Sequence, residues 1–215
     1  MDELRISNLK PFFLPDTGTA ASGSIWFNDV SFRKGTNYLV SASSGRGKSS
    51  FLSFVFGERT DYSGNIYFDN REIKTLKKTD WQNVRKVNIS YVFQGLRLFS
   101  ELTTLENIQL KNKITEYKSQ KEIDRLIEQS GLQDKRNEKT GRLSFGQQQR
   151  IAIIRALCQP FDFILLDEPF SHLDEQNIEI MTGLIIEELK RQNAGMLLCS
   201  LGYGYLFDYH ETYKI

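Results

Sequence analysis

The sequence predicts an α/β domain, and three observations lead to this fold class. Continuous apolar runs at residues 163–166 and 196–199 are typical of strands buried on both faces of a parallel sheet. Patterns typical of helices alternate with such strands along the 215-residue chain. A glycine-rich segment at 42–50 lies between a strand-like run and a helix-like run. The chain is long enough for one large domain with its own core and a subdomain.

The first half of the chain reads as short strands separated by loop signals. The proline, glycine and small polar residues of 11–24 predict a loop, and 34–37 predicts a turn. Residues 51–56 read as a helix that Gly57 can end. Residues 63–65 read as a turn into a hairpin that continues to residue 72. Strands are expected at 4–9, 24–33, 38–41, 66–68 and 89–93.

The middle of the chain is charged and has helical spacing from about 105 to 132. Ile123, Leu126 and Ile127 fall on one helix face there, and Gly131 can end the helix. A polar connector follows at 135–140, and a further amphipathic helix is expected at 177–192.

Composition limits the classes of function. The formal net charge of +1 gives no reason to expect nucleic acid as a partner. Cys158 and Cys199 lie in apolar runs, so we expect two buried thiols in a reducing compartment rather than a disulfide. No apolar stretch reaches membrane-spanning length and the first residues do not resemble a signal peptide. We therefore expect a cytoplasmic protein that reaches a membrane only through a partner.

The segment Ala42–Ser50 has the pattern of a phosphate-binding loop in which alanine replaces the first glycine. A concave row of backbone N–H groups there can surround a di- or triphosphate. Lys48 adds a positive charge for the β- and γ-phosphates, and the Ser49 hydroxyl is a ligand for Mg²⁺. The predicted nucleotide-binding residues of this loop are Ser43, Ser44, Gly45, Arg46, Gly47, Lys48, Ser49 and Ser50.

Two adjacent carboxylates, Asp167 and Glu168, end the buried strand at 163–166. Burying both would be costly unless they face a polar site. Asp167 would then hold Mg²⁺, and Glu168 would polarise or deprotonate an attacking water. Taken alone, the pair is equally consistent with a strand that runs into a surface turn.

The segment Leu143–Gln147 opens a helix, with Ser144 and Gln147 at the spacing of a capping box. A well-capped helix is sufficient to explain this pattern when it is taken alone. A helix N-terminus with a hydroxyl and nearby N–H groups is also a site for anions.

These blocks, in this order, resemble the nucleotide-binding domain of an ATP-binding cassette transporter over nearly the whole chain. The phosphate loop matches, as do 91–94 and the acidic strand at 163–168. Residues 143–147 match the family's signature segment, and 171–174 match the interface loop, a short loop that crosses the dimer interface in the family. The run 98–108 resembles the segment that follows Gln94 in one branch of the family, the lipoprotein-releasing and macrolide-export ATPases. The resemblance implies a P-loop NTPase core with an antiparallel β subdomain and an inserted helical subdomain. We expect the helical subdomain at about 104–142, within a core formed by 1–103 and 143–215.

The resemblance also implies a cofactor, partners and further site residues. ATP with Mg²⁺ would lie between the phosphate loop of one subunit and the signature segment of the other, in a head-to-tail homodimer or heterodimer. Gln94 would contact Mg²⁺ and the attacking water, and Phe12 or Phe13 would stack on adenine unless both are core residues. Hydrolysis would drive a separate transmembrane permease, which places the chain at the inner face of the membrane. In the signature segment, Ser144, Gly146 and Gln147 would meet the γ-phosphate across the dimer.

Three positions depart from the family pattern. Ala42 replaces a loop glycine, which matters only if its φ is positive. Phe145 replaces a signature glycine and could weaken the contact across the dimer. Leu201 stands where the family has a histidine that contacts the γ-phosphate, and leucine has no hydrogen-bond donor. His210 is too distant in sequence to replace it, and His172 belongs to the predicted interface loop, so neither is expected to substitute.

Two other functions therefore stay open beside that of a transporter ATPase. The chain could be a regulatory or structural ATP-binding module with little turnover, which Leu201 and Phe145 favour and Lys48, Gln94 and Glu168 oppose. It could also be a soluble cassette ATPase of DNA repair or translation. The short chain and its neutral charge make this last reading the weakest.

Overall fold

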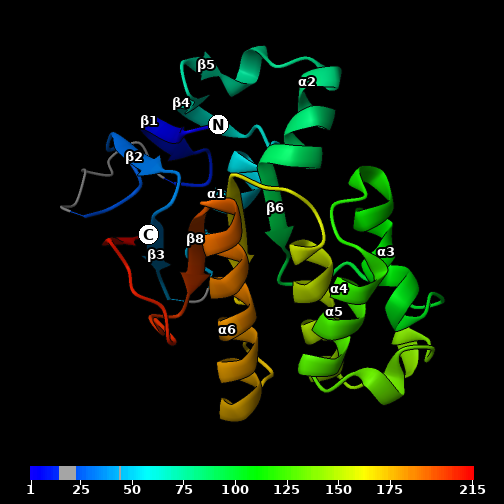
Figure 1. The fold of residues 1–215 in the computed structure, drawn as a ribbon. Coiled ribbons are helices and arrows are strands. Elements are labelled where there is room, and N and C mark those ends of the chain that lie inside the picture. The colour runs from blue at the N-terminus through cyan, green and yellow to red at the C-terminus, as the bar shows by residue number, and fades with distance from the viewer. Residues whose placement is uncertain (15–22, 44) are drawn as a thin grey trace.

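The computed structural model describes residues 1–14, 23–43 and 45–215 (Figure 1). The strands are β1 (Glu3–Pro11), β2 (Val30–Arg33), β3 (Asn37–Ser41), β4 (Tyr62–Phe68), β5 (Arg71–Glu72), β6 (Ile89–Val92), β7 (Phe163–Asp167), β8 (Gly195–Ser200) and β9 (Glu211–Lys214). The α-helices are α1 (Lys48–Val55), α2 (Lys78–Asn83), α3 (Thr104–Thr115), α4 (Gln120–Gln129), α5 (Phe145–Leu157) and α6 (Glu175–Gln192). A π-helical segment, η2 (Val84–Asn88), continues α2. The loop predicted at 11–24 lies largely outside the described residues.

The predicted parallel sheet is present and has the strand order β6-β7-β8-β3-β9. Every neighbouring pair in it is parallel. The carboxyl ends of these strands therefore open at one edge of the sheet, where α/β proteins bind their ligands.

A second, antiparallel sheet has the order β2-β1-β4-β5. The expected hairpin is formed by β4 and β5, which pair Phe68 with Arg71. Residues 63–65, expected as a turn, instead belong to β4 opposite a register shift between Ser7 and Lys10 of β1. Gly64 is required there, because a Cβ at this position would lie 2.2 Å from the Asn8 carbonyl oxygen.

The strand expected at 24–33 is much shorter in the structure, and only Val30–Arg33 pairs as β2. Phe27 has a φ of 66°, which an extended strand does not allow. The Ile25 N–H donates to the Lys214 carbonyl, and the Phe27 N–H donates to the Leu9 carbonyl. Residues 24–28 thus link the two sheets through single hydrogen bonds to β9 and β1, and they do not form a continuous strand.

The charged middle of the chain forms two helices, α3 and α4, with a break at Glu116, whose φ is 52°. Thr103 and Ser119 each close a capping box at a helix start. Both helices stand beside α5 at one side of the molecule (Figure 1). The exact subdomain boundaries stay a prediction.

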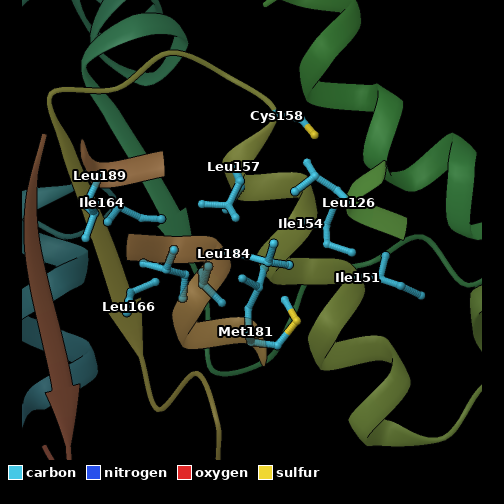
Figure 2. Close-up of a cluster of buried hydrophobic side chains, with 14 of the residues drawn as sticks. Leu126, Ile151, Ile154, Leu157, Cys158, Ile164, Leu166, Met181, Leu184 and Leu189 are labelled. Carbon is cyan, nitrogen blue, oxygen red and sulfur yellow. The ribbon is translucent and has the colours of Figure 1, made fainter. Parts of the chain in front are cut away.

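A hydrophobic core joins α5, α6 and the parallel sheet. In Figure 2, Leu157 of α5 lies on the side of strand β7, while Cys158 and Ile151 lie on the other side of the helix. The labelled members of this core are Leu126, Ile151, Ile154, Leu157, Cys158, Ile164, Leu166, Met181, Leu184 and Leu189. This packing fixes the start of α5, where Ser144 lies, relative to the end of β7, where Asp167 and Glu168 lie.

One buried ion pair ties the helical segment to α6. Lys118 Nζ lies 2.6 Å from Glu188 Oε2, and both side chains are less than a tenth exposed. The Tyr117 hydroxyl and the Gln192 amide donate to the other oxygen of Glu188 at 2.5 and 2.8 Å. The carboxylate is thereby fully hydrogen-bonded, as a buried charge must be.

Both cysteines are buried free thiols, as the sequence predicts. Burial raises the pKa of Cys158 to about 12, so this thiol stays protonated at neutral pH. Of the helices in the described part of the chain, none has the length and apolar character that crossing a membrane requires.

Candidate functional site

The site lies at the carboxyl edge of the parallel sheet. The phosphate loop follows β3, Gln94 follows β6, Glu168 follows β7 and Leu201 follows β8. Parallel pairing brings these four strand ends together although they are far apart in sequence. They surround a hollow of about 490 Å³. The described residues that line it are Phe13, Gly45, Gly47, Lys48, Ser49, Ser50, Gln94, Glu168, Ser171, His172 and Leu201.

The phosphate loop has the conformation that its glycines permit. Gly45 and Gly47 have φ values of 76° and 108°, where a side chain would be strained. Ala42 does not have a positive φ, so the alanine is accommodated at little cost. Ser43 lies at the loop with an exposed side chain, and Ser44 lies outside the described residues.

Lys48 is buried and points back across the loop. Its Nζ donates to the carbonyls of Ala42 at 2.9 Å and Ser43 at 3.3 Å, and lies 3.3 Å from Glu168 Oε1. An ammonium group in this position can exchange the carboxylate for a phosphate oxygen without moving far. The structure therefore brings together the predicted phosphate-binding lysine and the predicted base.

The other predicted loop residues differ in how their side chains are used. The Ser50 hydroxyl accepts a hydrogen bond from Arg59 at 2.8 Å, although Ser50 also lines the hollow. Arg46 is exposed and does not line the hollow.

The predicted magnesium ligands form a set of hard oxygens. The Ser49 hydroxyl lies 3.4 Å from the Gln94 amide oxygen. Asp167 Oδ1 is buried without a hydrogen-bond partner in the described structure. Burial raises the pKa of Asp167, and a hydrogen bond from Ser49 opposes that rise. A buried, unpartnered carboxylate oxygen beside a hydroxyl and an amide oxygen fits Mg²⁺, which prefers a few oxygen ligands together with phosphate.

Glu168 is held in an unusual backbone conformation, with a φ of 49°. Its N–H donates to the Cys199 carbonyl at 3.0 Å, and its carbonyl accepts from the Gln149 amide at 3.1 Å. Positive φ in a non-glycine residue costs about 1–3 kcal/mol and persists only where the surroundings enforce it. The two hydrogen bonds supply that constraint and turn the carboxylate toward Lys48.

The predicted adenine-stacking residues separate clearly. Phe13 lines the hollow, and its ring lies 3.0 Å from where a Cβ on Gly47 would stand. Phe12 is 66% exposed and does not line it. The geometry favours Phe13 as the aromatic residue beside a nucleotide.

The signature segment does not reach this hollow. Ser144 caps α5, with its hydroxyl accepting from the Gln147 N–H at 3.3 Å, and Gly146 packs against the following interface loop. A Cβ on Gly146 would lie 2.8 Å from the His172 carbonyl oxygen. None of these three residues is among the lining residues. Ser144, Gly146 and Gln147 therefore lie apart from the phosphate loop of their own subunit.

Two features of the site were not predicted. Gln149 is 1% exposed, and its amide group links Glu168 to the interface loop. No sequence signal distinguishes it from the glutamines at 147 and 148. His172, which was assigned to the interface loop and not expected to substitute for the histidine missing at 201, lines the hollow. Its neighbour Ser171 does so as well.

This fold and site define a nucleotide-binding protein with a phosphate loop at the edge of a parallel sheet. The sequence profile of the family described as ABC transporter matches residues 27–171. The chain thus belongs to the ABC transporter ATP-binding family, as its motifs predict.

Curated relatives agree with this assignment. The chain is 30% identical to the lipoprotein-releasing system ATP-binding protein LolD of Buchnera aphidicola subsp. Schizaphis graminum, over 80% of this chain and 76% of that protein. It is 36% identical to the uncharacterized ABC transporter ATP-binding protein YclH of Bacillus subtilis, over 79% and 76%.

A solved structure also matches the fold. The dimeric bacterial ABC transporter cassette MJ0796 is 26% identical, with a TM-score of 0.77, over 92% of this chain and 88% of that one. A further structure of MJ0796 is a post-hydrolysis dimer bound to ADP and phosphate, with a TM-score of 0.76.

Proposed function

We propose that this chain is the ATPase subunit of a transporter, which binds Mg-ATP in a head-to-tail dimer and hydrolyses it to drive a separate permease. The observation that carries the proposal is the meeting of Lys48, Glu168, Gln94 and the unpartnered Asp167 oxygen at one sheet edge. A phosphate loop, a set of magnesium ligands and a base are the parts that ATP hydrolysis needs. When bound, Mg²⁺ would neutralise phosphate charge beside Ser49, Gln94 and Asp167.

In this mechanism each residue has a distinct task. The loop N–H groups and Lys48 hold the phosphates, and Glu168 orients and deprotonates the attacking water. Phe13 stacks on the adenine. Ser144 and the neighbouring α5 N–H groups contact the γ-phosphate from the partner subunit, because in their own subunit they lie away from the hollow. A dimer of cassettes is the state in which MJ0796 was solved.

The first test is steady-state hydrolysis of Mg-ATP by the purified chain beside Lys48→Ala. We expect the natural chain to exceed the variant by at least 100-fold, since loss of one phosphate contact costs about 10²–10³ in rate. Equal rates in the two proteins would contradict hydrolysis. ATP binding measured on both proteins then shows whether a nucleotide-binding function remains.

A regulatory module that binds ATP with little turnover is the second candidate. It is favoured by Leu201, which lines the hollow, is 53% exposed and offers no hydrogen-bond donor. ATP-dependent dimerisation of the natural chain with no turnover above Lys48→Ala would support this second candidate.

We further propose that the permease docks on an apolar groove formed by two adjoining hollows beside α3, one against the π-helical segment η2 and the other against β6 and α5. The hollows share Lys111 and Ile114, and the exposed side chains Phe99 and Leu110 line one of them. Burial lowers the pKa of Lys111, and the charges of Arg155 and Arg85 add to this effect. An apolar floor beside several cations suits an amphipathic segment that carries a carboxylate. Docking here would hold the chain at the cytoplasmic face of the membrane.

Ile114→Asp is expected to weaken recruitment by about 30-fold, since it places a charge in the centre of an apolar contact worth about 2 kcal/mol. The measurement is the share of the chain recovered with membranes after co-expression with its permease. Lys113→Asp is the matched control, because Lys113 is exposed on the same helix and lines neither hollow. Equal recovery of Ile114→Asp and Lys113→Asp would place the docking surface elsewhere.

A further inference from the structure

The hollow at the sheet edge is lined by a histidine that does not come from the end of β8. Leu201 occupies one wall, where a donor toward the γ-phosphate is missing. His172, from the loop that follows β7, lines the same hollow together with Ser171 and Glu168. Among the described lining residues it is the only histidine.

The imidazole of His172 contacts the Phe145 ring and the Ser171 hydroxyl. Its ring packs on Phe145, with the ring centroids 4.3 Å apart and the planes at 57°. Its backbone N–H donates to Gln149 Oε1 at 3.1 Å. The close approach of Gly146 to the His172 carbonyl fixes the loop against the start of α5. Phe145 therefore acts as a positioning residue for the ring.

The hydrogen bonds around Ser171 are compatible with a ring that carries its proton on Nε2. The Gln149 amide donates to Ser171 Oγ at 3.3 Å, and the same oxygen lies 2.8 Å from His172 Nδ1. A hydroxyl that accepts from the amide can still donate its own proton, and Nδ1 is within its reach. A neutral imidazole that accepts at Nδ1 carries its proton on Nε2.

The same buried amide connects this ring to the predicted base. Gln149 Nε2 also donates to the Glu168 carbonyl at 3.1 Å. The Gln149 side chain thus connects the interface loop directly to Glu168. Contacts that orient the ring before phosphate binds reduce the entropy lost when it makes a hydrogen bond.

We propose that His172 contacts the γ-phosphate, with Nε2–H donating to a phosphate oxygen in place of the histidine that Leu201 lacks. The inference rests on the proposed hydrolysis of ATP and names a further residue for it. It also relates the departure at Phe145 to the departure at Leu201. Phe145 takes the place of a glycine and supports the ring that supplies the missing donor.

The test compares Mg-ATP turnover by the natural chain with His172→Ala, His172→Gln and the double variant His172→Ala/Leu201→His. We expect His172→Ala to lower kcat by about 10²–10³-fold, the usual effect of losing one such donor, with a much smaller change in KM. His172→Gln keeps an N–H near the Nε2 position and should recover part of the rate. The double variant should recover at least tenfold over His172→Ala. His210→Ala is the matched control, because this histidine is exposed and lies outside the hollow.

Each result decides between the inference and the function on which it rests. If the natural chain is active and His172→Ala equals it, the inference is overturned and hydrolysis stands. If His172→Ala is slow and neither glutamine nor the histidine at 201 restores turnover, His172 is only structural and the inference is overturned. If the natural chain is no faster than Lys48→Ala, hydrolysis fails and the inference fails with it. Turnover by Leu201→His in that case would show an intact site that His172 does not complete.

Discussion

Replacing Glu168 with glutamine is expected to lower kcat for ATP hydrolysis by about 10²–10⁴-fold, the usual contribution of a general base. Glutamine has the shape of glutamate and cannot take a proton from water. Lys48 keeps its hydrogen bonds to the carbonyls of Ala42 and Ser43, so the phosphate loop should hold its conformation. ATP binding should therefore persist while turnover is lost.

The measurement combines single-turnover kinetics with the oligomeric state in the presence of Mg-ATP. Because hydrolysis is expected to release the dimer, Glu168→Gln should remain dimeric with ATP. Lys48→Ala is the contrasting control, since it removes a phosphate contact and should neither bind ATP well nor dimerise. Full turnover by Glu168→Gln would show that another group activates the water.

Replacing Lys118 with methionine is expected to lower the free energy of unfolding by about 3–5 kcal/mol, because it leaves the Glu188 carboxylate buried without its cation. That carboxylate is less than a tenth exposed and receives hydrogen bonds from Lys118, Tyr117 and Gln192. Tyr117 and Gln192 cannot neutralise the charge. The loss should separate α3 and α4 from α6 before it affects the sheet.

Urea denaturation of the two proteins measures this difference. Arg125→Met is the matched control, because Arg125 pairs with Glu187 while both side chains are more than half exposed. Such a surface pair contributes about 0–1 kcal/mol. The double variant Lys118→Met/Glu188→Leu should recover most of the stability, since it removes both charges. Equal losses for Lys118→Met and Arg125→Met would show that the pair is not effectively buried.

The strands of the parallel sheet were the most predictable part of the fold. Residues 163–166 and 196–199 are apolar throughout because both faces of their strands are covered, and this leaves a direct trace in the sequence. The strand at 24–33 was predicted too long, because not every apolar residue in it belongs to a strand. Its apolar side chains are buried by a bend at Phe27, and burial in a bend has no periodicity to read.

In the candidate site, too, some residues could be predicted from the sequence and others could not. Lys48, Ser49, Gln94, Asp167 and Glu168 were named from motifs, and the structure places them at one edge. Phe12 and Phe13 could not be separated in sequence, because adjacent residues differ only in the direction in which the backbone turns them. Gln149 was missed because a buried glutamine and an exposed one look alike in sequence.

The amino-acid sequence by itself determined the family, the phosphate loop, the acidic strand end and the three departures at Ala42, Phe145 and Leu201. These depend on residue type at short spacing, which local chemistry defines. Only the tertiary structure decided that Ala42 needs no positive φ and that Phe13 faces the hollow. It alone placed the His172 ring against Phe145 and in the same hollow as Leu201. Such contacts join segments that the chain separates by tens of residues, and strand order and helix packing bring them together.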